Sequence, residues 1–233
     1  MRTSKGLGLS AALLTAGLGA TASPAWATPV IDTSSAPVYS YIYGFGDAAA
    51  ATFGQTFTAT GAETQLDSFA FRMHDYFGAI DFAAYVYAWD GKKAIGPELY
   101  ESGAVSNPGG SDAFETFNFD TSGVSLVAGQ QYVAFMSVSN YFGAPNVGET
   151  YLELNKNAYT DGYAVYDRSS GDFSQLLTQT WDSLLDSGGF LAPNDTWFKA
   201  SFSAPAAVPE PNTIALILAG GAALAIVRRR KVV

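Results

Sequence analysis

Apolar and polar residues alternate along the middle of the chain, most clearly between residues 80 and 89. One set of alternate positions is apolar throughout and consists of Ile80, Phe82, Ala84, Val86 and Ala88. The intervening set consists of Asp81, Ala83, Tyr85, Tyr87 and Trp89. Because successive side chains of a β-strand point to opposite faces, this period of two predicts a strand. Asp90-Gly91 follows and predicts a tight hairpin turn.

Similar segments, rich in Tyr, Phe, Thr and Val, recur between turn residues along residues 38–202. In segment 114–121, Phe117 and Phe119 alternate with Asn118 and Asp120. The other predicted strands are Val38–Tyr43, Thr52–Thr60, Leu66–Met73, Tyr132–Val138, Tyr151–Leu154, Tyr163–Asp167 and Trp197–Phe202. About eight to ten short, evenly spaced strands are typical of an all-β fold, an antiparallel β-sandwich or jelly roll. We expect residues 28–203 to form this domain.

One motif predicts how two strands are joined. Leu126, Gly129 and Tyr132 match the L-x-x-G-x-x-Y pattern of a tyrosine corner, in which the Tyr hydroxyl bonds to backbone upstream. Gly129 would adopt the turn conformation that a Cβ disfavours. The alternative is an ordinary core or surface tyrosine at position 132.

The only helical periodicity lies in Phe173–Leu185, where apolar residues recur at spacings of three and four. We expect one or two helical turns there, or an irregular loop across the sandwich. Residues 204–208, which begin Ala204-Pro205, have the composition of a short linker.

The N-terminal residues 1–27 have the organisation of a secretory signal peptide. Arg2 and Lys5 precede an apolar run from Leu7 to Ala20, and Ala25-Trp26-Ala27 forms an A-x-A cleavage site. We therefore expect the domain to be exported.

The C-terminal residues 209–233 combine a short motif, an apolar run and a basic end. The motif is Val208, Pro209, Glu210 and Pro211, and the cations are Arg228, Arg229, Arg230 and Lys231. The predicted transmembrane segment is 213–227; its uncharged run from Ile214 to Val227 would form a helix roughly 21 Å long. That is shorter than the ~30 Å hydrocarbon core, so it would be a poor permanent anchor. The alternatives are a buried core helix and a single-pass anchor that is never cleaved.

This order of features resembles the PEP-CTERM sorting signal of Gram-negative bacteria. In that family an exosortase, an integral-membrane enzyme, recognises the tail and cuts near the Pro-Glu-Pro triplet. The resemblance implies an inner-membrane intermediate, followed by the cell surface, the outer membrane or the extracellular matrix. Because the sorting system is associated with exopolysaccharide, the resemblance also implies exopolysaccharide as a partner.

The middle of the chain also resembles exported bacterial β-sandwich domains that often carry PEP-CTERM tails. The similar runs are Gly54–Phe57, Tyr85–Gly91 and Ala128–Phe135. The resemblance covers roughly residues 50–203; it supports the fold and implies no activity.

Charge narrows the choice of partners. Six of the 12 cations but only one of the 21 acids lie in the terminal segments, so the domain has a net charge near −14. Nucleic acid is disfavoured as a partner, because binding phosphates needs a basic surface. Calcium is the one cofactor that the composition leaves open, through Asp161, Asp167 and Asp172 or through Asp112 and Asp120.

Candidate catalytic groups are few. The chain has no cysteine, which excludes thiol nucleophiles. His74 is its only histidine, which excludes zinc sites that need two or more histidines. His74 and Asp75 are adjacent and would face opposite sides of a strand, so the two cannot easily bond to each other. The remaining candidates are two carboxylate pairs, Glu98 with Glu101 and Asp182 with Asp186, which we interpret as solvated groups. We predict no catalytic residue and no bound metal.

Tyr85, Tyr87 and Trp89 share one face of a predicted strand and are the candidate platform for stacking a sugar ring. The alternative is that a second sheet or a loop covers this face. We therefore expect an exported, non-enzymatic surface or matrix protein associated with exopolysaccharide. A carbohydrate-binding module is the alternative, and an exported hydrolase is less favoured.

Overall fold

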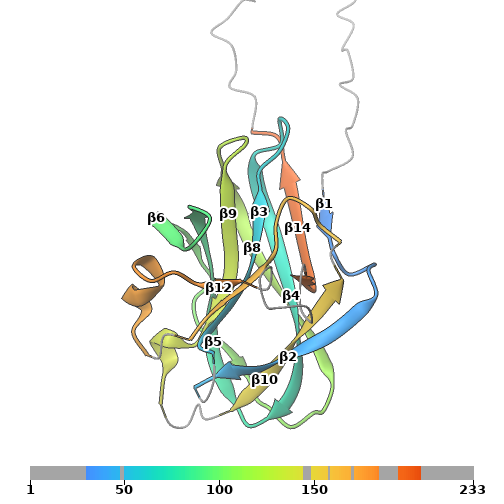
Figure 1. The fold of residues 1–233 in the computed structure, drawn as a ribbon, viewed down its shortest axis with the longest axis vertical. Coiled ribbons are helices and arrows are strands. Elements are labelled where there is room, and N and C mark those ends of the chain that lie inside the picture. Colours follow the sequence, from blue (N-terminus) through green and yellow to red (C-terminus); the bar gives the residue numbers. More distant parts are fainter. Residues whose placement is uncertain are drawn as a thin grey trace, which may run out of the picture.

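The computed structural model describes residues 30–47, 50–143, 148–156, 158–168, 171–183 and 194–205. In these residues the chain folds into two antiparallel β-sheets of seven strands each, packed face to face (Figure 1). This architecture confirms the predicted all-β sandwich. Two short 3-10 helices, η1 (Ser139–Tyr141) and η2 (Phe173–Leu177), accompany the strands.

The first sheet is organised around β4 (Gln65–Phe77), which is 13 residues long. β8 (Phe114–Ser125) pairs along one side of β4. On the other side, β14 (Phe198–Ser203) pairs with the first half of β4 and β10 (Glu149–Lys156) with its second half. The sheet is completed by β1 (Val30–Asp32) beside β14, β2 (Val38–Gly46) beside β10, and β13 (Asn194–Thr196) at the end of β10.

The second sheet has β3, β9 and β5 at its centre. Its order is β12 (Asp182–Ser183), β11 (Ala164–Asp167), β3 (Thr52–Thr58), β9 (Gln131–Ser137), β5 (Ile80–Trp89) and β6 (Ala94–Glu101), and β7 (Val105–Asn107) also pairs with β5.

Phenylalanines dominate the core between the sheets. Those at most 1% exposed in this core are Phe45, Phe53, Phe57, Phe69, Phe71, Phe82 and Phe198. On β5 the inward positions are Phe82, Ala84 and Val86, as the alternation predicted.

Each segment predicted as a strand contains one, and the prediction over residues 80–89 has the bounds of β5. β6 was missed because Gly96-Pro97 interrupts its apolar pattern. Gly96 has φ +76°, and the pairing register shifts between Val86 and Ala88. A proline is tolerated there because β6 is an edge strand. The strands β1, β7, β12 and β13 are too short to show a period.

The tyrosine corner is present between the two sheets. The backbone N–H of Val127 donates to the Tyr132 hydroxyl at 2.7 Å, and Gly129 has φ +81°. Leu126 is buried, and the Gly129 N–H donates to the Ala59 carbonyl at 2.7 Å. The corner fixes the passage from β8 in the first sheet to β9 in the second.

In its described part, residues 173–183, the segment with helical spacing forms η2, followed by turns and β12. The Asp172 carboxylate caps η2 by accepting the Ser174 N–H. Leu176 and Trp181 are buried, so the segment covers part of the sandwich as a loop with one short helix.

The first and last described residues lie at the same end of the sandwich, because β1 and β14 pair with Val30 opposite Ser201 (Figure 1). The predicted signal peptide (1–27) and sorting segment (209–233), with its transmembrane run, lie outside the described residues. Within the described residues, no helix has the length and apolarity needed to cross a membrane.

Candidate functional site

The rings predicted as a sugar platform lie on the outer face of the second sheet and are buried. Tyr85, Tyr87 and Trp89 are only 1%, 4% and 5% exposed. The Phe173 ring of η2 lies 4.7 Å from that of Tyr85, and the Trp181 ring lies 5.4 Å from that of Trp89. The prediction of an exposed platform is therefore wrong, because the segment that contains η2 covers these rings.

The two buried tyrosines point their hydroxyls toward the carboxylates on β6. The Tyr85 hydroxyl donates to Glu101 Oε1 at 3.3 Å and accepts a hydrogen bond from Asn140 Nδ2 at 3.1 Å. The Tyr87 hydroxyl donates to Glu98 Oε2 at 3.3 Å. Burial raises the pKa of both phenols, and the neighbouring carboxylates raise it further. Glu98 and Glu101 thus serve as acceptors at the rim of this buried cluster.

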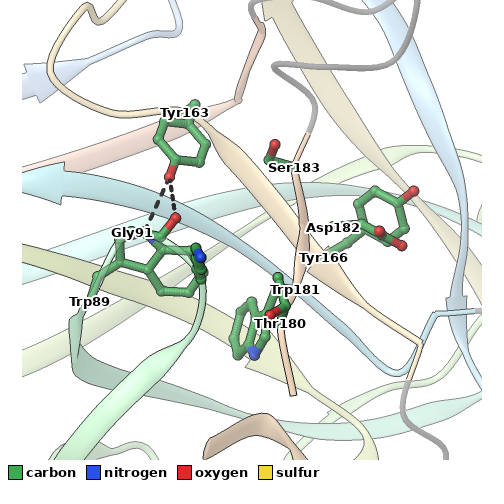
Figure 2. A pocket seen from close by; sticks show the side chains of 9 residues that line it. Trp89, Gly91, Tyr163, Tyr166, Thr180, Trp181, Asp182 and Ser183 are labelled. Carbon is green, nitrogen blue, oxygen red and sulfur yellow. Dashed lines mark hydrogen bonds between the residues drawn. The ribbon is translucent and has the colours of Figure 1, made fainter. Parts of the chain in front are cut away.

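A groove opens beside Trp89, where the turn after β5 meets β11 and β12. Its volume is about 490 Å³. Its lining residues, drawn in Figure 2, include Trp89, Lys92, Tyr163, Tyr166, Trp181 and Asp182.

The turn between β5 and β6 forms one wall of the groove. Asp90 Oδ1 accepts the N–H groups of Lys92 at 2.8 Å and Lys93 at 2.9 Å. The predicted turn is therefore present, and it places Lys92 at the mouth of the groove. The Lys92 carbonyl in turn accepts a hydrogen bond from the backbone N–H of Trp181 at 2.8 Å, which joins the turn to the segment after η2.

The two indoles of the groove use their N–H groups inside the protein. Trp89 Nε1 donates to the Tyr163 hydroxyl at 3.2 Å, and Trp181 Nε1 donates to the Leu176 carbonyl at 2.9 Å. Asp182 lies opposite Tyr166 in the β11–β12 ladder. The lining of the groove thus combines aromatic residues with hydroxyl groups, one cation (Lys92) and one anion (Asp182).

The second predicted carboxylate pair is described only in part. Asp182 lines the groove, and Asp186 lies outside the described residues. For calcium, no group of three or more acidic or histidine side chains close enough to hold a metal ion is found in the described part of the chain.

His74 and Asp75 face different partners, as the strand geometry predicted. His74 Nε2 lies 3.4 Å from Asp112 Oδ1, whereas Asp75 is buried and its Oδ2 accepts the Ser111 N–H at 2.8 Å.

Sequence reasoning missed a group on the outer face of the first sheet. Arg72 Nη1 donates to Glu153 Oε2 at 3.1 Å, and the Arg72 guanidinium lies over the Phe114 ring, with Cζ 4.6 Å from the ring centroid. Burial raises the pKa of Glu153, and Arg72 offsets this only partly. The residues come from three strands that are far apart in the sequence, so no local pattern connects them.

A family model for the PEP-CTERM protein-sorting motif matches residues 207–231. This chain carries a PEP-CTERM sorting signal. The match spans the motif from Val208 to Pro211 and the cations from Arg228 to Lys231. The signal implies export, an intermediate anchored in the membrane, and processing by an exosortase.

No curated protein matches the sequence significantly. Among solved structures, the clostridial cysteine protease Cwp84 after propeptide cleavage is similar over 76% of this chain, with a TM-score of 0.51 and 15% identity. A structure of the cysteine protease and lectin-like domains of Cwp84, a surface layer associated protein of Clostridium difficile, is similar over 66%, with a TM-score of 0.42 and 14% identity. This chain spans 40% and 32% of those two structures. At 15% identity, the likeness to the first concerns the fold alone.

Proposed function

We propose that the chain is an exported, non-enzymatic protein of the cell surface or extracellular matrix that is associated with exopolysaccharide. The observation that carries this proposal is the sorting signal at residues 207–231. The signal supports export of the β-sandwich to the surface, and in this proposal the domain meets exopolysaccharide there.

Two features of the domain fit the non-enzymatic part of the proposal and limit its partners. The hydroxyls of Tyr85 and Tyr87, whose rings are covered by the segment that contains η2, donate hydrogen bonds to Glu101 and Glu98. These two carboxylates therefore act as hydrogen-bond acceptors for a buried cluster. The domain carries a net charge near −14, which suits a soluble exported protein and disfavours polyanionic partners.

Processing and location are tested together in the native host. We expect the intact mass of the exported protein to lack residues 1–27 and the segment after the Pro209-Glu210-Pro211 motif. We also expect the protein to fractionate with the exopolysaccharide and to be released when that polymer is digested. A mature species that retains Arg228–Lys231 would contradict sorting, and fractionation away from the polymer would contradict the association.

The non-enzymatic part has its own test. The exported protein is incubated with polysaccharides, chromogenic esters and casein, and we expect no turnover above that of a buffer control. Turnover that disappears in Glu98→Gln or Glu101→Gln would assign catalysis to the β6 carboxylates and overturn this part of the proposal.

A carbohydrate-binding module that uses the groove is the second candidate. The observation in its favour is the size of the groove, about 490 Å³, together with its aromatic lining. Such a volume suits one sugar or a short oligosaccharide. Calorimetry with short neutral oligosaccharides should then show binding that is weakened by Lys92→Ala and Asp182→Ala. Both side chains are at the surface, so the substitutions leave the core intact.

A further inference from the structure

A cluster of aromatic and basic side chains lies on the outer face of the first sheet, which we call the β4 outer face. It contains Tyr41 on β2, Arg72 and His74 on β4, Phe114 on β8 and Tyr151 on β10. Phe114 lies opposite His74, and His74 lies opposite Tyr151, in two adjoining ladders. The four strands therefore bring the cluster together across the width of the sheet.

Phe114 is at the centre of this cluster. Its ring centroid lies 4.8 Å from that of His74 and 5.4 Å from that of Tyr41. Because β10 and β4 separate the strands of Tyr41 and Phe114, flat strands would place them about 14 Å apart. The side chains therefore lean toward one another, and their rings form a continuous apolar surface.

The cluster combines exposed ring area with a fixed hydrogen-bond donor. Tyr41 is 39% exposed and the Arg72 side chain 36% exposed, whereas Glu153 beneath is only 3% exposed. Contact with both Glu153 and the Phe114 ring holds the guanidinium in place. A guanidinium has five N–H donors, and among the described residues Arg72 uses one of them, for the bond to Glu153, so further donors can bond to a ligand.

Local charge disfavours an anionic ligand at this face. The carboxylate of Glu153 is paired with Arg72, and the exposed carboxylate of Asp112 lies beside His74 at the border of the face. They offset the charge of Arg72, so the surface suits a neutral ligand with an apolar face and hydroxyl groups. A pyranose ring has both, because its C–H groups can pack on aromatic rings while its hydroxyls bond to Arg72.

The β4 outer face also lies far from the end of the domain that leads to the sorting signal. Ser203, at the end of β14, pairs with Gln65 at the start of β4. His74 is nine residues further along β4, a distance of roughly 30 Å at 3.3 Å per residue. In Figure 1 the described ends lie at the top, and β2 and β10 lie at the bottom. A protein held through its C-terminus would present this face away from the attachment point.

We propose that the β4 outer face binds neutral polysaccharide, by stacking pyranose rings on Tyr41 and Phe114 and bonding their hydroxyls to Arg72. The inference rests on the proposed association with exopolysaccharide and names the surface that makes it. An open sheet face can contact a polymer anywhere along its length, whereas the groove beside Trp89, with a volume of about 490 Å³, has room only for a short ligand. The tryptophans of the groove are at most 5% exposed and donate their N–H groups internally.

The test is affinity electrophoresis of the exported protein in native gels. Four gels contain dextran, galactomannan, a mixed-linkage β-glucan or the anionic polygalacturonate. We expect at least one neutral polymer to retard the protein. Tyr41→Ala should weaken the apparent affinity roughly tenfold, because it removes both the stacking ring and the apolar area that the ring buries against the sugar. Arg72→Lys keeps the charge beside Glu153 but loses the fork of donors, and should also weaken binding. Tyr41→Phe keeps the ring and should bind within twofold of the unaltered protein.

Two variants serve as matched controls. Phe142 is 38% exposed outside the cluster, so Phe142→Ala removes an aromatic ring of equal exposure and should leave binding unchanged. Lys92→Ala alters the groove of the second candidate, so it distinguishes the two sites: polymer binding through the β4 outer face should be unchanged in this variant. Equal thermal unfolding of all variants shows that folding is not the cause of any loss.

The outcomes separate the inference from the proposal on which it rests. Binding that survives Tyr41→Ala and Arg72→Lys, or that is lost only in Lys92→Ala, overturns the assignment to this face. Retardation by polygalacturonate alone, or by none of the four polymers, overturns the ligand class. If neutral polymers bind through Tyr41 but the protein does not fractionate with the exopolysaccharide of its host, the surface stands and the association fails.

Discussion

Removing the Tyr132 hydroxyl tests the joint between the two sheets. Tyr132→Phe keeps the ring, which is 3% exposed and stacks on Phe57 at a centroid distance of 5.9 Å. The change deletes the acceptor of the Val127 N–H, which lies 2.7 Å from the hydroxyl. One intramolecular hydrogen bond contributes about 1 kcal/mol, and up to about 2 kcal/mol if the N–H is left without a partner. We therefore expect the free energy of unfolding to fall by about 1–2 kcal/mol.

The measurement is urea unfolding followed by circular dichroism, with thermal unfolding as a second assay. For a domain of this size the loss corresponds to a decrease in Tm of roughly 2–8 °C. The control is Tyr166→Phe, the same chemical change in a partly exposed ring, which should alter stability by less than about 0.5 kcal/mol.

A second substitution shows whether the corner acts as a unit. A Cβ at Gly129 would meet nothing within 4 Å, so Gly129→Ala costs only what φ +81° imposes on alanine, about 1 kcal/mol. Because Gly129 and Tyr132 shape the same turn, the double variant should lose less than the sum of the single losses. An unchanged unfolding midpoint in Tyr132→Phe, or strict additivity of the pair, would refute the reasoning.

Two further predictions concern packing and pH. A Cβ at Gly162 would lie 1.9 Å from the Thr56 carbonyl oxygen, so Gly162→Ala should destabilise by about 3 kcal/mol in urea unfolding. Gly91→Ala would meet nothing within 4 Å and should cost only what φ +93° imposes on alanine, about 1 kcal/mol. Because burial raises the pKa of Glu153 above its ordinary value of 4.5, the folded state holds this proton more tightly than the unfolded state does. The contribution of Glu153 to stability is therefore full below pH about 4.5 and declines as pH rises through the folded pKa. Glu153→Gln, which keeps a hydrogen-bond acceptor for Arg72, should remove this decline, and a parallel pH profile in the variant would show that Glu153 is not its source.

Strands and the corner could be predicted because their signals are local. Alternation over residues 80–89 defines β5 without knowledge of its neighbours, and the spacing of Gly129 and Tyr132 defines a turn. The alternation does not show which face another segment covers. Tyr85 and Trp89 were therefore interpreted as a platform, although Phe173 and Trp181, about 90 residues later in the sequence, bury them.

The β4 outer face was not predictable for a related reason. Its members occupy positions 41, 72, 74, 114 and 151, each unremarkable in its own segment. Only the pairing of β8, β4, β10 and β2 brings them onto one surface. The sorting signal is the opposite case, because it is a contiguous motif of 25 residues that is independent of the fold.

The place of β14 determines how the domain responds to force. The chain leaves the sandwich just after Ser203, and β14 is hydrogen-bonded to β1 on one side and to β4 on the other. Tension on the C-terminal tail therefore acts along β14, while its ladder bonds lie perpendicular to that direction. Both ladders are loaded in shear, so their bonds must break together and not one after another from a free end. A domain pulled between a bound polymer and its C-terminal attachment would resist extraction of β14 for this reason.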